Sequence, residues 1–134
     1  MAHQGYARNA GAVFSLKYHL VFCPKYRKPV LVGPVAERLQ ALLAAKAREL
    51  KATLHTLEVM PDHVHMFVES DPGIAPAKLA AQFKGYTSRM LRQEFRHLRS
   101  QLPSLWSRSY GIWTEGRWHQ ATCEDFVQTQ PRRS

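Results

Sequence analysis

Acidic side chains, cysteines and long apolar runs are all scarce in this sequence. Aspartate and glutamate together number 10, against 19 lysines and arginines. Cys23 and Cys123 are the two cysteines, and no C-x-x-C motif is present, so neither a disulfide scaffold nor a zinc knuckle is expected. No apolar run approaches the ~20 residues of a membrane span, and the first residues contain no apolar signal segment. We therefore expect no membrane association.

The balance of charge is the clearest signal in the composition. A net charge of +9 on 134 residues is typical of a domain that binds a polyanion, most often nucleic acid. A solvated basic surface would give the same count. Hydrophobic content of 45% and charged content of 22% are ordinary for a folded protein. We expect a single domain over residues 1–134, located in the cytoplasm and associated with the nucleoid.

Hydrophobic periodicity predicts the secondary structure. Residues 13–23 alternate apolar and polar side chains, as a half-buried strand does. Further strands are predicted at 52–60, 63–69 and 109–114, and helices at 34–51, 76–99 and 120–130. This order predicts an α+β, ferredoxin-like βαββαβ sandwich, in which two helices cover one face of a four-stranded antiparallel sheet. The core would span 13–114, the tail helix would follow at 120–130, and the second sheet face would stay open.

A pair of histidines lies in the run MPDHVHMFV (60–68). Alternate residues of a strand share a face, so His63 and His65 point one way while Val64 and Met66 point to the core. Two imidazoles at this spacing, roughly 6.5–7 Å apart, can converge on one metal ion. The alternative is a pair of half-exposed strand histidines with no ligand. A metal site would also need a third ligand.

The tail helix offers a third ligand for such a site. Phe126 and Gln130 are four residues apart and therefore share a helix face. The amide oxygen of a glutamine is a neutral donor. With two histidines it would leave a bound Mg²⁺ or Mn²⁺ its full positive charge, which suits a phosphate substrate. Alternatively, Gln130 is a solvated polar residue near the C-terminus.

Several longer motifs resemble one known family. They are YHLVFCPKYRKPVL (18–31), EVMPDHVHMFV (58–68), FKGYTSRML (83–91) and SYGIWTEG (109–116). In this order and spacing, which covers about residues 13 to 130, the sequence resembles the TnpA-type HUH transposases of small insertion sequences that transpose as single-stranded DNA. HUH denotes histidine, hydrophobe, histidine, here His63-Val64-His65.

The resemblance implies a function and a set of partners. It implies a bacterial or archaeal homodimer that binds imperfect DNA hairpins at the element ends, with Mg²⁺ or Mn²⁺ held by His63, His65 and Gln130. A tyrosine on the tail helix would cut single-stranded DNA through a 5′-phosphotyrosine link, and strands would rejoin without a nucleotide cofactor. In this family the tail helix of one subunit can complete the site of the other.

The sequence departs from the family at the catalytic position. Four residues before Gln130, where the family has its nucleophilic tyrosine, stands Phe126. Phenylalanine has no hydroxyl, so we expect the chain to bind DNA without cleaving it. Either a tyrosine has been replaced to trap uncleaved DNA, or the chain is a naturally inactive or domesticated hairpin-binding relative. A third interpretation is a repeat-associated tyrosine transposase. Tyr18, Tyr86 and Tyr110 are better interpreted as core residues than as substitute nucleophiles.

Two basic clusters are predicted to contact DNA. Arginines recur at helical spacing on the predicted helix 76–99, with a lysine a turn earlier, and a second cluster follows the first strand. Solvated helix and loop faces are the alternative. Lysine and arginine contacts to phosphate would give affinity and salt dependence without sequence choice, and Tyr26 could stack on an unpaired base. The predicted DNA-binding residues are Lys25, Tyr26, Arg27, Lys28, Lys84, Arg89, Arg92 and Arg96.

Overall fold

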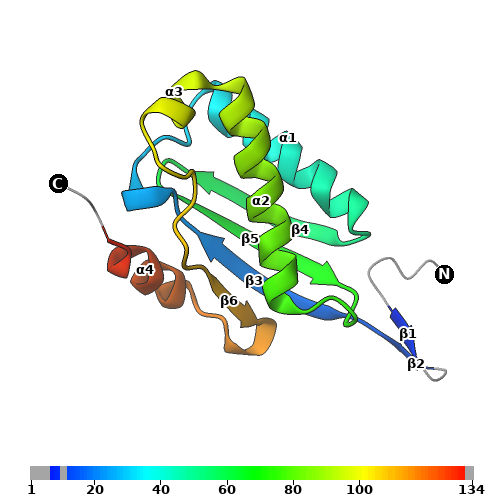
Figure 1. Cartoon of the computed structure of the whole chain (residues 1–134). Coiled ribbons are helices and arrows are strands. Elements are labelled where there is room, and N and C mark those ends of the chain that lie inside the picture. The colour runs from blue at the N-terminus through cyan, green and yellow to red at the C-terminus, as the bar shows by residue number, and fades with distance from the viewer. Residues whose placement is uncertain (1–6, 10–11, 132–134) are drawn as a thin grey trace.

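A computed structural model describes residues 7–9 and 12–131 of the chain (Figure 1). A short hairpin of β1 (Ala7–Asn9) and β2 (Ala12–Phe14) precedes the main sheet. The main sheet contains β3 (Leu16–Phe22), β4 (Thr53–Met60), β5 (His63–Ser70) and β6 (Gly111–Thr114). The helices are α1 (Pro34–Glu49), α2 (Pro76–Glu94), α3 (Arg96–Ser100) and α4 (Gln120–Thr129), with one-turn 3-10 helices η1 (Lys25–Arg27) and η2 (Glu115–Arg117).

The main sheet confirms the predicted ferredoxin-like topology. Its strand order is β4-β5-β3-β6, and every neighbouring pair is antiparallel. Strands β4 and β5 form the predicted hairpin around the turn at Pro61 and Asp62. Strand β5 therefore lies inside the sheet, where Val21 of β3 is the cross-strand partner of His65.

Helices α1 and α2 cover one face of the sheet, where they close the main core (Figure 1). Both helices begin at a proline, which lacks the N–H that a first helical turn leaves unpaired. Val64, Met66 and Val68 alternate along β5 toward this core and are fully buried, as the sequence pattern predicts. Across the described residues, no helix is long and apolar enough to span a membrane.

Helix α4 packs on the opposite face of the sheet, beside β3 and β6 (Figure 1). Cys123 and Val127, one turn apart on α4, are buried against Val21 and Cys23 at the end of β3. This face was expected to be open. The tail helix instead covers part of it, because its Cys123 and Val127 form a small apolar stripe that needs a partner.

The predicted strand 13–23 is divided at Ser15. β2 ends at Phe14 and β3 begins at Leu16. The Ser15 hydroxyl donates a hydrogen bond of 2.7 Å to the buried carboxylate of Glu69, which also contacts Nε2 of His55 at 2.7 Å. Burial by itself would raise the pKa of Glu69, but these hydrogen bonds and the charges of His55 and Lys17 lower it overall.

The predicted helix 76–99 is also divided. Phe95 has extended backbone angles (φ −123°, ψ 103°), so α2 ends at Glu94 and α3 begins at Arg96. The turn lets Leu98 become fully buried, and the Arg99 guanidinium donates to the Arg92 carbonyl at 2.7 Å. The expected single stripe of arginines on one long helix is therefore wrong.

Candidate functional site

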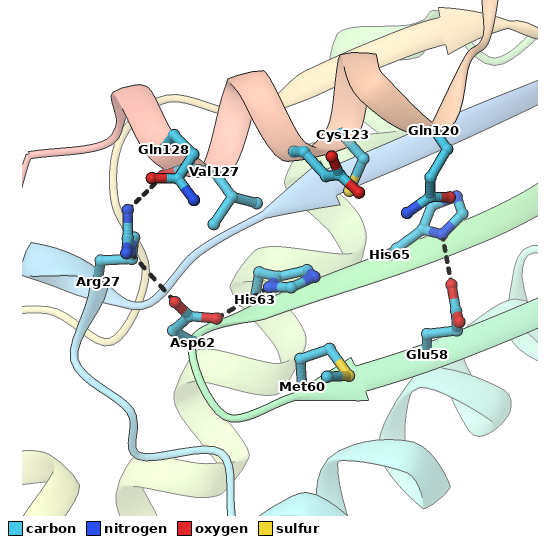
Figure 2. A pocket seen from close by; sticks show the side chains of 11 residues that line it. Arg27, Glu58, Met60, Asp62, His63, His65, Gln120, Cys123, Val127 and Gln128 are labelled. Carbon is cyan, nitrogen blue, oxygen red and sulfur yellow. Dashed lines mark hydrogen bonds and ion pairs between the residues drawn. The ribbon is translucent and has the colours of Figure 1, made fainter.

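The histidine pair lies in the wall of a pocket of about 360 Å³ between the β4–β5 hairpin and α4 (Figure 2). Both His63 and His65 line it, so the prediction that they share one face of β5 is confirmed. The hairpin and η1 supply the other side chains on one side, and α4 supplies those on the other. The pocket is lined by Arg27, Glu58, Met60, Asp62, His63, His65, Gln120, Cys123, Glu124, Val127 and Gln128.

His63 is held by a carboxylate from the adjacent turn. Its side chain is 20% exposed, and its Nδ1 lies 2.9 Å from Oδ1 of Asp62. An ionised carboxylate only accepts hydrogen bonds, so in a neutral His63 this contact places the proton on Nδ1 and leaves the lone pair on Nε2. The other Asp62 oxygen, Oδ2, lies 3.1 Å from Nε of Arg27. Figure 2 shows this chain of contacts from Arg27 to His63.

His65 is held on both ring nitrogens. Its Nδ1 lies 2.9 Å from Oε1 of Glu58, the residue opposite it on β4. Its Nε2 lies 2.9 Å from Nδ1 of His19 on β3. Because Glu58 is an acceptor, a neutral His65 is protonated at Nδ1, and His19 donates to Nε2. A ligand at Nε2 of His65 would therefore take the place of the His19 hydrogen bond.

Aromatic stacking fixes the planes of these rings. Trp118 lies nearly parallel to His19, with centroids 4.2 Å apart, and to His65 at 4.5 Å. Phe67 stacks on His19 at 4.4 Å. Burial, together with the nearby His65, lowers the pKa of His19 to about 4 against the opposing charge of Glu115. His19 is therefore neutral at neutral pH and acts as a hydrogen-bond donor.

The donor chemistry fits a divalent metal at the two histidines. Metal-binding histidines usually donate their other ring N–H to a carboxylate, which sets the tautomer and the ring orientation. Here Asp62 and Glu58 provide that contact for His63 and His65. Among the described residues, however, no group of three or more His, Cys, Asp or Glu side chains is arranged to hold a metal. A metal held by the two histidines would therefore need further ligands of another kind, such as amide, water or substrate oxygens, or ligands from outside this arrangement.

The tail helix does not bring Phe126 or Gln130 to the histidine pair in this structure. Neither residue lines the pocket. Gln130 is buried, and its Oε1 accepts a 2.6 Å hydrogen bond from Ser109 while its Nε2 donates to the Phe126 carbonyl at 3.0 Å. The Phe126 ring packs edge-on against Trp113, with centroids 5.9 Å apart. The role of Gln130 as a ligand remains a prediction.

Three of the predicted DNA-binding cations are engaged within the protein. Lys84 donates to the carbonyls of Ser107 and Arg108 at 2.8 and 3.3 Å, and burial lowers its pKa. Arg92 donates to the Leu102 carbonyl at 3.2 Å. The Arg27 side chain is 9% exposed and donates to the Val127 carbonyl at 2.9 Å. Sequence spacing could not distinguish these cations from solvated ones, because their partners are backbone carbonyls of distant segments.

The remaining predicted contacts lie nearer the surface. Lys28, Arg89 and Arg96 are exposed. The Lys25 ammonium lies 5.4 Å from the centroid of the Tyr26 ring, and that ring packs against the main core. Whether these residues contact DNA remains a prediction.

Four residues that shape the site were not predicted from the sequence. Asp62 contacts His63 and Glu58 contacts His65, while His19 and Trp118 also contact His65. A weak signal for Asp62 exists, since it directly precedes His63 in PDHVH. His19 is one of the polar residues in the alternating run 13–23, but its contact with His65 depends on how β3 pairs with β5.

The fold and the paired histidines define the class of protein first. An antiparallel ferredoxin-like sheet that carries histidine, hydrophobe, histidine on an interior strand is the arrangement expected of an HUH transposase. The particular family follows from comparison with known proteins. The family described as "Transposase IS200 like" matches residues 12–130, and the chain belongs to this family.

Individual relatives agree with this assignment. The chain is 34% identical over 125 residues to the ISDra2 transposase TnpA of Deinococcus radiodurans. This match covers 92% of this chain and 89% of the relative. It is 28% identical over 119 residues to the transposase for insertion sequence element IS200 of Salmonella typhimurium, covering 87% and 78%.

Solved structures confirm the fold. The crystal structure of a candidate transposase from Deinococcus radiodurans R1 has a TM-score of 0.87 and 31% identity, covering 95% of this chain and 99% of that chain. The REP-associated tyrosine transposase bound to a REP hairpin has a TM-score of 0.52 and 13% identity, covering 86% and 64%. At that identity the second likeness concerns the fold alone.

Proposed function

We propose that this chain recognises single-stranded DNA hairpins at the ends of an insertion sequence and presents a scissile phosphate to a divalent metal site. The observation that carries the proposal is the pair His63 and His65, which line one pocket and are each held at Nδ1 by a carboxylate. Mg²⁺ or Mn²⁺ bound by their Nε2 atoms, with the amide oxygen of Gln130, would neutralise charge on the phosphate.

Phe126 determines what this chain does with the bound DNA. A tyrosine at this position would supply the oxygen that attacks the phosphate, whereas a phenylalanine ring has no nucleophilic atom. The chain therefore binds hairpin DNA and leaves it intact. The same residue also favours a second function, that of a naturally inactive hairpin-binding protein. The 34% identity to an insertion-sequence transposase over 92% of the chain supports the insertion-sequence type over the repeat-associated type.

Binding and cleavage can be tested on the same oligonucleotides. We expect the chain to bind a single strand that contains an element-end hairpin more tightly than an unstructured strand of equal length, as measured by fluorescence anisotropy with Mn²⁺. Denaturing gels should show no covalent protein–DNA band for this chain and a Mn²⁺-dependent band for Phe126→Tyr. Binding by both proteins without a band for Phe126→Tyr would support the inactive hairpin-binding protein instead.

We also infer that a homodimer completes the site, with the tail helix of one subunit serving the histidines of the other. Within one chain, Phe126 packs on Trp113 and Gln130 contacts Ser109, so neither faces His63. A mixing experiment tests this inference. The double variant Phe126→Tyr/His63→Ala lacks a metal ligand, and the parent chain lacks the tyrosine, so each alone should be inactive. Their mixture should form a covalent DNA adduct, and an inactive mixture would overturn the inference.

A further inference from the structure

Arg27 occupies a position that its expected role as a DNA contact does not explain. Its side chain is 9% exposed and lies at the edge of the histidine pocket rather than on the surface. Arg27 and Tyr26 both have positive φ, 54° and 61° respectively. A residue other than glycine in this region is strained, and such strain persists only where the surrounding structure requires it. Here the strained turn directs a guanidinium inward.

The guanidinium of Arg27 joins the tail helix to the β4–β5 turn (Figure 2). Its Nη1 donates a 2.9 Å hydrogen bond to the carbonyl of Val127 in the last turn of α4. A cation at this end of a helix is favourable, because the last carbonyls carry partial negative charge, and the Val127 carbonyl accepts one further hydrogen bond, from the Gln130 N–H at 3.2 Å. Its Nε lies 3.1 Å from Oδ2 of Asp62, an ion pair without hydrogen-bond geometry.

Asp62 continues the connection to the metal ligand. Its second oxygen, Oδ1, lies 2.9 Å from Nδ1 of His63. One carboxylate therefore bridges Arg27 and His63 and sets the tautomer in which Nε2 of His63 can bind a metal. Each contact restrains the next, from the Val127 carbonyl to the imidazole.

We propose that Arg27 is a positioning residue that couples docking of the tail helix to the metal-binding orientation of His63 through Asp62. The proposal rests on the proposed function, because it takes His63 as a metal ligand. Because coupling is reciprocal, a docked helix favours metal binding, and a bound metal favours the docked helix. Within one chain, position 126 of this helix packs on Trp113, so the coupling concerns metal binding and helix docking and does not itself place the nucleophile position.

Two measurements on the full chain report the two ends of this connection. Isothermal titration with Mn²⁺ alone gives metal affinity. Labelling of Cys123 with iodoacetamide, located by peptide mass spectrometry, reports undocking of α4. Cys123 lies on the buried face of the helix and is 4% exposed, and burial, with the nearby Glu58 and Glu124, raises the pKa of its thiol. The thiol should therefore react slowly while the helix is docked.

Substitutions can distinguish a positioning role of Arg27 from a general loss of structure. Asp62→Asn keeps the shape of the side chain and should weaken Mn²⁺ binding by about 10- to 100-fold. Arg27→Gln touches no ligand atom, yet it should weaken Mn²⁺ binding by about 2- to 30-fold and speed labelling of Cys123. Arg27→Lys keeps the charge without the fork of donors and should fall between Arg27→Gln and the parent chain. Arg48→Gln, an exposed arginine of α1, is the matched control and should change neither quantity.

Reciprocity supplies the decisive comparison. Saturating Mn²⁺ should slow labelling of Cys123 in the parent chain and have little effect on it in Asp62→Asn. The proposal is overturned if Arg27→Gln binds Mn²⁺ as tightly as the parent chain while His63→Ala abolishes binding. If Arg27→Gln does not fold, the same comparison is made with Asp62→Asn. If His63→Ala binds Mn²⁺ as tightly as the parent chain, the proposed function fails instead.

Discussion

A buried hydrogen bond between α2 and the segment before β6 gives the most quantitative test of the fold. Thr87 is fully buried, and its hydroxyl accepts a 3.0 Å hydrogen bond from Nε1 of Trp106. The same hydroxyl donates to the Phe83 carbonyl at 2.7 Å. Trp106 is 6% exposed and packs edge-on against Phe22. This contact fixes the segment that leads through β6 to the tail helix.

Thr87→Val keeps the shape of the side chain and removes the hydroxyl. The indole N–H of Trp106 would then be buried without an acceptor, which costs about 1–3 kcal/mol. The added methyl group offsets up to ~0.8 kcal/mol of this cost. We expect a net loss of about 1–2 kcal/mol in the free energy of unfolding. In a Trp106→Phe background there is no N–H to satisfy, so the same substitution should cost little or nothing.

Urea denaturation of the parent chain, both single variants and the double variant measures the interaction between the two side chains. An interaction energy of about 1 kcal/mol or more is expected for groups in direct contact. If the effect of Thr87→Val is the same in both backgrounds within about 0.5 kcal/mol, the substitutions are additive, and the assigned hydrogen bond does not hold this segment in solution.

Three further predictions follow from the charged groups. Replacing exposed Lys28 or Arg96 by glutamine should weaken hairpin binding. It should also reduce the magnitude of the salt slope, d log K/d log [salt], by about 0.7 for each phosphate that the side chain neutralises. An unchanged slope would show that the residue does not contact the DNA. Lys84→Gln should lower the melting temperature with no change in the salt slope, since its ammonium binds backbone carbonyls. The lowered pKa of Glu69, whose ordinary value is 4.5, stabilises the fold above pH 4.5, and this stability is lost as pH falls through the lowered value. Glu69→Gln should therefore flatten the acid limb of the stability curve, and an unchanged limb would contradict the assignment.

The sheet and its histidine face could be predicted because they depend on local periodicity. The alternation of Val64, Met66 and Val68 with His63 and His65 determines the two faces of β5 before any partner strand is known. The order of strands and helices then leaves few alternatives to the ferredoxin-like topology. The resemblance of the quoted motifs to the transposase family is likewise confirmed.

Other features could not be predicted because they depend on contacts between distant segments. The contact of His65 with His19 and Trp118 joins three parts of the chain. The charge of Arg27 is visible in the sequence, whereas its burial against Val127 is not. The docked face of α4 did have a local signal, the apolar pair Cys123 and Val127 one turn apart, but two apolar residues do not indicate which surface they cover.

Cleavage by the histidine site can be measured as the intact mass of Phe126→Tyr after incubation with Mn²⁺ and a strand carrying the element-end hairpin. We predict a mass increase equal to one cleaved DNA fragment, mapped to position 126 by peptide digestion. The increase should be absent in the parent chain, without Mn²⁺, and in Phe126→Tyr/His63→Ala. If Phe126→Tyr binds the hairpin and Mn²⁺ but gains no DNA mass, then His63 and His65 do not form a competent cleavage site in this protein.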